Sequence, residues 1–178
     1  LRNTAGHDIN FIARSGILSH AGKAESGPSL MNFQIGDIAS GTMNSVVAIL
    51  AAVNYRRNTG KGQYIDISMS DGCIPFNSID GANFLVSGKA PKREKERLNG
   101  GCIYDFYQTK DGEYVAVGSL EPQFWSKFCM AIEREDLIEG TIWPEEIDSV
   151  KAEIRGIMKT KTKAEWTKQF AGLDACVE

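Results

Sequence analysis

Residues 33–57 read FQIGDIASGTMNSVVAILAAVNYRR, and after Gly60-Lys61-Gly62 the chain continues with QYIDISMS at residues 63–70. In the first stretch the large apolar residues recur every three or four positions, which predicts a helix with one buried face. Gly60 can end this helix, because glycine readily adopts the left-handed conformation found at helix C-termini. In the second stretch apolar residues alternate with Asp and Ser, which predicts a strand with one buried face. A helix followed by a tight turn and a strand predicts a mixed α and β protein.

Two glycines, Gly36 and Gly41, fall in the first turns of the predicted helix. Glycine inside a helix costs about 1 kcal/mol relative to alanine. We therefore expect another backbone segment or a ligand to approach the helix closely at these two positions.

Shorter elements are predicted on either side of this region. Residues 1–31 read mostly as loop. The further expected elements are a short helix or strand near Ile9, a helix over residues 71–86, hairpin strands over 102–109 and 113–119, helices over 122–132 and 144–158, and a last helix opened by a Thr162–Glu165 capping box. The charged residues 87–98 read as a solvated linker between a first unit, residues 1–86, and a second unit, residues 99–178.

Composition excludes several classes of protein. The chain has 178 residues, a formal charge of −3, 42% apolar residues and 24% charged residues, as in an ordinary globular protein. A pI near 5.5 argues against nucleic acid as the main partner. The longest strictly apolar run is residues 46–53, far short of the roughly 20 residues that a membrane span needs. The four cysteines have no paired spacing, so we expect reduced thiols in a cytoplasmic protein and no metal site.

Three residues are candidates for acid–base chemistry. His7 lies between Gly6 and Asp8 in a segment of low apolar content, where it is either a proton carrier or a hydrogen-bonded loop histidine. Asp37 lies in the first turn of an apolar helix, on or beside its buried face; it is either a reactive carboxylate or an N-terminal charge. Glu121 precedes Pro122 at a helix start, where capping is the simpler interpretation.

The remaining polar candidates receive structural interpretations. His20, in a polar loop, is expected to be exposed to solvent. Asp66 and Asp71 flank a strand end and a helix start, and neither is assigned chemistry.

Several segments together resemble a known family. They are residues 6–11 (GHDINF), 36–41 (GDIASG), 57–63 (RNTGKGQ), 120–125 (LEPQFW), 161–166 (KTKAEW) and 173–176 (LDAC). Taken in order, they resemble the α-methylacyl-CoA racemase branch of the family III CoA-transferases. The resemblance spans nearly the whole chain, which makes it more specific than any single motif.

The resemblance implies part of a nucleotide-fold large domain followed by a small α+β domain. It also implies that family segments lie before Leu1 and after Glu178, so we expect the chain to be a fragment of a longer protein. An acyl-CoA thioester is the implied substrate, with no metal or redox cofactor. Interlocked homodimers are the implied assembly, and neither nucleic acid nor a membrane span is expected.

The implied reaction inverts the carbon beside the CoA thioester through an enolate. His7 and Asp37 match the two proton carriers of the family, and Glu121 matches the partner of the histidine. The two carriers fit this chemistry if burial raises the pKa of Asp37 toward neutrality.

The backbone of residues 6–11, which comprises Gly6, His7, Asp8, Ile9, Asn10 and Phe11, is implied to contact the CoA thioester. In the family the amide after the histidine helps to hold the enolate oxygen. Phe11 departs from the branch, which usually has tyrosine at this position.

Two alternatives stay open. In a CoA-transferase of the same family, the aspartate matching Asp37 would be a nucleophile that forms covalent acyl and CoA intermediates. In a noncatalytic remnant, the chain would keep its fold and its self-association but bind CoA poorly. The presence of both His7 and Glu121 favours the racemase.

Overall fold

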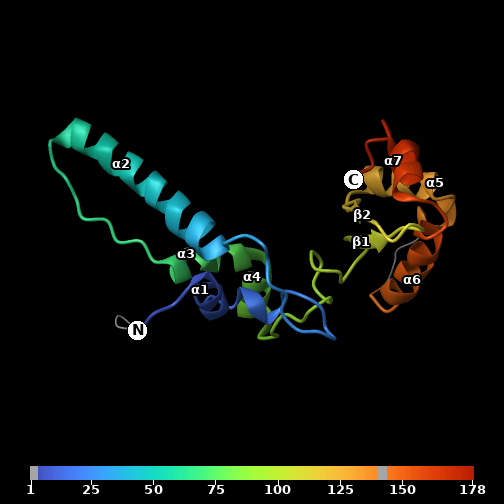
Figure 1. Ribbon diagram of the computed structural model, residues 1–178, viewed down its shortest axis with the longest axis horizontal. Helices are drawn as coiled ribbons and strands as arrows, with labels where there is room; N and C mark the ends of the chain where they lie inside the picture. The colour runs from blue at the N-terminus through green and yellow to red at the C-terminus, as the bar shows by residue number, and fades with distance from the viewer. Residues whose placement is uncertain (1–3, 140–143) are drawn as a thin grey trace. The chain divides into compact units, whose positions relative to one another are not determined.

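The computed structural model describes residues 4–139 and 144–178, and it divides into two compact units, residues 1–93 and 94–178 (Figure 1). The division falls inside the charged segment 87–98. Arg93, the last residue of the first unit, is held by that unit, because its guanidinium donates hydrogen bonds to the carbonyls of Ala21 and Leu18 at 2.8 and 2.9 Å.

The described part of the first unit is helical. Its elements are α1 (Asp8–Arg14), η1 (Ile17–Ser19), η2 (Ile35–Met43), α2 (Asn44–Thr59), α3 (Met69–Cys73), η3 (Ile74–Asn77) and α4 (Ser78–Ser87). The prediction of one helix over residues 71–86 is therefore correct in type, but the segment forms three short pieces. Pro75 lies at the start of the middle piece, where its missing N–H and fixed φ interrupt a regular α-helix.

The predicted helix over residues 33–57 is confirmed as η2 and α2, which follow each other without a break. Its first part is a π-helix and its second part an α-helix. Gly60 ends it with φ of 73°, as expected.

The predicted buried face of this helix is not buried within the described chain. Several of its large apolar side chains are about half exposed or more: Ile38, Met43, Val46, Val47, Ile49, Leu50 and Val53. The 25 residues from Ile35 to Thr59 are long and apolar enough to cross a membrane by length and composition, although their longest strictly apolar run has only eight residues. A single helix of this kind is weak evidence for a membrane span, because core helices of soluble proteins pass the same test.

The predicted strand over residues 63–70 is wrong. Residues 61–68 run between α2 and α3 without regular secondary structure, and α3 already begins at Met69 (Figure 1). The expected alternation is nevertheless visible in burial, since Ile65 and Ile67 are half-buried while Asp66 and Ser68 are exposed. A strand needs a hydrogen-bonded neighbour, and the described residues provide none for this segment.

The second unit is a hairpin covered by helices. Strands β1 (Asp105–Gln108) and β2 (Tyr114–Val117) pair antiparallel, with Asp105 opposite Val117. The helices are α5 (Pro122–Ala131), η4 (Glu135–Leu137), α6 (Ile147–Met158) and α7 (Lys163–Phe170). This confirms the predicted hairpin, the three helices and the capping box, although the strands are shorter than expected and α6 begins later.

The core of the second unit joins the hairpin to α5, α6 and α7. It contains Ile103, Tyr107, Val115, Val117, Phe128, Cys129, Ile132, Ile154, Met158, Trp166, Phe170 and Ala175. A buried ion pair lies at its edge, where Lys151 Nζ is 2.7 Å from Asp105 Oδ2. Lys151 also donates to the carbonyl of Gly100, which satisfies a second proton of its ammonium group.

Candidate active site

His7 is the N-cap residue of α1, and its side chain is exposed. Its backbone N–H donates to Asn10 Oδ1 at 3.0 Å, and its carbonyl accepts from the amides of Asn10 and Phe11. A Cβ on Gly6 would come within 3.1 Å of the Phe11 ring, so the chain is closely packed just before the histidine. The local sequence thus fixes the backbone at His7 and leaves the imidazole accessible.

Asp37 lies in the first turn of η2, as predicted, but its side chain is exposed. Sequence reasoning placed it on or beside a buried face, and the described residues do not bury it. Its backbone is held at both ends: the N–H donates to Asp8 Oδ1 at 3.0 Å, and the carbonyl accepts from Thr42 Oγ1 at 3.0 Å. π-Helical turns are rare and occur frequently at functional sites.

Asp8 therefore joins two motifs that are 29 residues apart in the chain. It is the first residue of α1, directly after His7, and its carboxylate contacts the turn that carries Asp37. Gly36 makes this contact possible, because a Cβ at that position would lie 3.0 Å from Asp8 Oδ1 and 3.5 Å from Ile12 Cγ2. The structure thus brings the His7 and Asp37 segments together in one place.

Both glycines of the predicted helix lie at close approaches, as expected. Gly36 is buried against α1, and a Cβ on Gly41 would lie 3.1 Å from Met69 Cγ in α3. Elements α1, η2 and α3 therefore pack on one another through small residues. We call the contact region of these three elements the α1–η2–α3 junction.

Ser40 and Cys73 form the interior of this junction, and both are fully buried. Ser40 Oγ donates to the carbonyl of Met69 at 2.6 Å. Burial raises the pKa of the Cys73 thiol, so the cysteine packs as a neutral group and not as a reactive thiolate. The sequence analysis did not single out Ser40. It could have been noticed as a small polar residue between the two glycines of an apolar helix.

Glu121 is the N-cap residue of α5, in the second unit. Its carbonyl accepts from the amides of Phe124 and Trp125, but its exposed side chain makes no capping hydrogen bond. The capping interpretation therefore holds for the backbone and not for the carboxylate.

His20 is not a solvent residue. Its side chain is 13% exposed, and its Nε2 lies 3.4 Å from Asp80 Oδ2 in α4. Ser19 Oγ lies 3.2 Å from the other ring nitrogen. The partner is 60 positions away in the chain, which is why a local reading of the loop could not find it.

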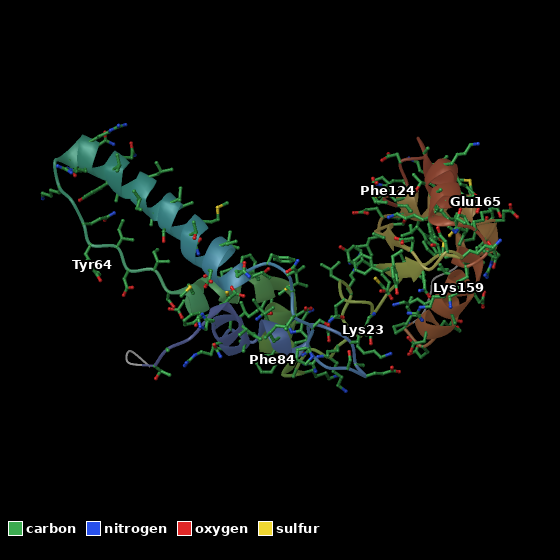
Figure 2. All side chains as sticks on the ribbon, viewed as in Figure 1. Lys23, Tyr64, Phe84, Phe124, Lys159 and Glu165 are labelled. Carbon is green, nitrogen blue, oxygen red and sulfur yellow. The ribbon has the colours of Figure 1, made fainter. Side chains whose placement is uncertain are left out.

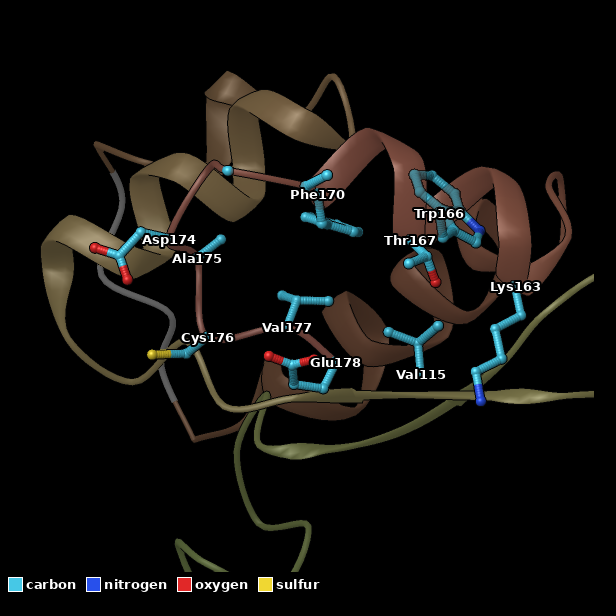
Figure 3. A pocket seen from close by; sticks show the side chains of 12 residues that line it. Val115, Lys163, Trp166, Thr167, Phe170, Asp174, Ala175, Cys176, Val177 and Glu178 are labelled. Atoms are coloured by element: carbon cyan, nitrogen blue, oxygen red, sulfur yellow. The ribbon is translucent and has the colours of Figure 1, made fainter.

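Three cavities in the described residues bear on these candidates, and one of about 330 Å³ is lined by Leu120 and Pro122, the chain neighbours of Glu121. A cavity of about 90 Å³ lies beside Asp8 and is lined largely by apolar residues of α1 and of segment 28–33. A cavity of about 680 Å³ in the second unit lies between α7 and the C-terminal segment 171–178, beside Val115 (Figure 3). None of the predicted site residues lines the cavity of about 680 Å³. The described residues also contain no group of three or more His, Cys, Asp or Glu side chains that could hold a metal ion.

The model of the CoA-transferase family III matches residues 1–178. The chain is 36% identical to the alpha-methylacyl-CoA racemase of Homo sapiens over 179 aligned positions, which cover 97% of this chain and 46% of that protein. It is 30% identical over 130 positions to the succinyl-CoA:mesaconate CoA-transferase of Haloarcula hispanica, covering 73% of this chain and 32% of that one.

This chain belongs to the CoA-transferase family III. A solved structure of a CAIB/BAIF family protein from Brucella suis shares its fold, with a TM-score of 0.75 at 23% identity over 97% of this chain and 47% of that chain. The mixed α and β fold implied by the resemblance is thereby confirmed. The chain spans about half the length of the relatives it matches.

Proposed function

We propose that this chain carries the two proton carriers of an acyl-CoA racemase. The reaction removes the proton from the carbon beside the thioester carbonyl, leaves its electron pair in an enolate, and returns a proton to the opposite face. The observation that carries the proposal is the 3.0 Å hydrogen bond from the Asp37 amide to Asp8, which joins the GHD and GD motifs. The similarity to alpha-methylacyl-CoA racemases supports it.

The roles follow from the residue types. His7 and Asp37 can each take up and release a proton, so one can act on each face of the α-carbon. The amide of Asp8 is the first of α1 and has no helical carbonyl to donate to, so it can donate to the enolate oxygen. Glu121 is proposed, on family resemblance, as the group that orients His7.

Proton exchange from solvent tests the proposal. The chain is incubated with a 2-methylacyl-CoA in deuterated water, and loss of the α-proton signal is followed by NMR. We expect exchange of both enantiomers in the wild type and in the Asp66→Asn control. Exchange should fall by at least about 100-fold for one enantiomer in His7→Ala and for the opposite enantiomer in Asp37→Asn, since general acid–base groups contribute roughly 10²–10⁴-fold. Exchange that survives in the double variant would contradict the assignment.

A CoA-transferase is the second candidate, because Asp37 is exposed and the chain resembles a succinyl-CoA:mesaconate CoA-transferase. In that reaction the Asp37 carboxylate attacks the thioester carbonyl, CoA leaves as a thiolate, and an acyl anhydride remains on the enzyme. The returning thiolate then attacks the aspartyl carbonyl of the anhydride, the acyl group leaves as a carboxylate, and an aspartyl-CoA thioester remains. A covalent mass increase on Asp37 after incubation with acyl-CoA, without α-proton exchange, would establish this reaction instead.

We also propose that the chain self-associates, with a homodimer as the smallest assembly. The exposed apolar side chains of α2, among them Val47 and Leu50, support this, since contiguous apolar surface of this kind marks an interaction site. A chain that self-associates but neither exchanges the α-proton nor is stabilised by acyl-CoA would be a noncatalytic remnant.

A further inference from the structure

We infer that the carboxylate of Asp8 is a positioning residue that holds the backbone of Asp37 in place relative to His7. The inference rests on the proposed function and adds a role that neither the acid–base pair nor the thioester contact contains. Its basis is the hydrogen bond from the Asp37 N–H to Asp8 Oδ1, at 3.0 Å.

Because of its position in the chain, Asp8 can fix the backbone of Asp37 relative to His7. Asp8 follows His7 directly and begins α1, so its carboxylate is fixed to the same rigid turn as the imidazole. Asp37 belongs to a different helix, and the helix start is the part most free to shift, since its first amides have no helical acceptor. An ionised carboxylate at that point accepts one of these amides and also faces the positive end of the helix.

Gly36 lets the carboxylate of Asp8 approach the η2 backbone closely. Gly36 is buried, and even a methyl group there would lie 3.0 Å from Asp8 Oδ1. Ile12, one turn further along α1, is also buried, and its Cγ2 would lie 3.5 Å from a Cβ on Gly36. The carboxylate therefore meets the η2 backbone itself, with no side chain between them.

The contact matters for the proposed chemistry because Asp8 takes part in both stabilising the enolate and positioning a proton carrier. The backbone N–H of Asp8 is the proposed donor to the enolate oxygen, and its carboxylate holds the turn that carries a proton carrier. A displacement of about 1 Å between such groups costs on the order of 10²-fold in rate. Asp8 thus links the proposed donor to the enolate oxygen with the turn that carries Asp37.

The test compares Asp8→Ala, which removes the acceptor, with Asp8→Asn, which keeps an acceptor oxygen and removes the charge. Asp66→Ala and Asp66→Asn, at an exposed position, are the matched controls. Hydrogen exchange of the Asp37 amide is measured by NMR, and amides of α2 report whether the first unit stays folded. The α-proton exchange of a 2-methylacyl-CoA gives kcat and KM.

We expect the Asp37 amide to exchange at least about 10-fold faster in Asp8→Ala, because this variant loses the hydrogen bond. In Asp8→Asn, which keeps an acceptor oxygen, the exchange rate should stay within about 3-fold of the wild-type rate. We expect kcat to fall by about 10–100-fold in Asp8→Ala, with a smaller fall in Asp8→Asn and little change in KM. Both Asp66 variants should match the wild type.

Equal Asp37 amide exchange in Asp8→Ala and the wild type would overturn the inference. So would an equal loss of kcat in both Asp8 variants with an unchanged Asp37 amide, because Asp8 would then act in the reaction itself. A wild-type chain that shows no α-proton exchange would refute the proposed function alone, and the amide measurement would still decide whether Asp8 holds Asp37.

Discussion

Gly72 is a position at which an added side chain would collide with its neighbours. A Cβ there would lie 2.1 Å from Ser40 Oγ in η2 and 2.7 Å from Asn44 Nδ2 at the start of α2. We predict that Gly72→Ala destabilises the first unit by about 1–3 kcal/mol, as overpacking of a closely packed interior does. All three tryptophans lie in the second unit, at positions 125, 143 and 166, so the measurement is amide exchange in η2 and α3.

Gly62→Ala is the matched control for this prediction, because nothing lies within 4 Å of a Cβ at that position. It should change amide exchange in the junction by no more than about 0.5 kcal/mol. Equal effects of the two substitutions would show that the junction is not packed as described.

The ion pair between Lys151 and Asp105 differs from the surface pairs by its burial, with side chains 4% and 9% exposed. Asp105→Ala would leave a buried ammonium without its carboxylate, and we predict a loss of about 3–5 kcal/mol in the stability of the second unit. The pair between Lys95 and Asp148, 58% and 75% exposed, is the control, and Asp148→Ala should cost no more than about 1 kcal/mol. Denaturation followed by tryptophan fluorescence measures both; comparable losses would contradict the burial of the first pair.

The sequence supports His7 and Asp37 as candidates for acid–base chemistry, but it does not show which residues contact them. His7 and Asp37 could be proposed because their neighbours form recognisable motifs. The hydrogen bond between Asp8 and the Asp37 amide could not, since it joins positions 29 residues apart and depends on the packing of two helices. The contact of His20 with Asp80 was missed for the same reason.

Among the elements, α7 offers a test of pH dependence. Thr162 accepts from the Glu165 amide, and Glu165 accepts from the Thr162 amide and hydroxyl. These hydrogen bonds lower the pKa of Glu165, because they favour its ionised form. The folded state therefore binds a proton less readily than the unfolded state, and the carboxylate stabilises the fold at neutral pH.

We predict that wild type is more stable than Glu165→Gln above the ordinary glutamate pKa of about 4.3, and that the difference disappears as the pH falls through the lower pKa of the folded state. Urea titrations of the second unit across this range measure it (Figure 2 labels Glu165). A difference that does not change with pH would show that the charge of Glu165 does not contribute to the cap.

The elements themselves were predicted well wherever the signal was local. The helix over residues 33–57, its end at Gly60 and the Asp111-Gly112 hairpin depend on neighbours within a few positions, and the structure confirms them. The strand prediction for residues 63–70 was wrong because the alternation of apolar and polar residues describes only which side chains are buried. A strand also needs backbone hydrogen bonds to a neighbouring strand. Tyr64, which is 90% exposed, shows how little of the described chain packs on this segment (Figure 2).

For the whole molecule, the exposed apolar surface of α2 is the feature from which we predict association between chains in solution. Val47 and Leu50 are 66% and 64% exposed in the chain as described. We predict that the chain self-associates and that Val47→Lys combined with Leu50→Lys reduces this association by at least about 10-fold, since the variant places charges on the apolar surface. Asn54→Lys adds a charge to the same helix at a polar position and is the control. Sedimentation velocity over a range of concentrations measures the effect, and a wild type that stays monomeric throughout would contradict it.

We propose that His7 and Asp37 act as two proton carriers on opposite faces of one carbon. Each pure enantiomer of a 2-methylacyl-CoA, incubated in deuterated water with wild type, His7→Ala or Asp37→Asn, tests it most directly. We expect wild type to exchange the α-proton of both enantiomers. Each variant should still exchange one enantiomer with retention of configuration, and the two variants should exchange opposite enantiomers. Loss of exchange with the same enantiomer in both variants, or inversion by either variant, would contradict it.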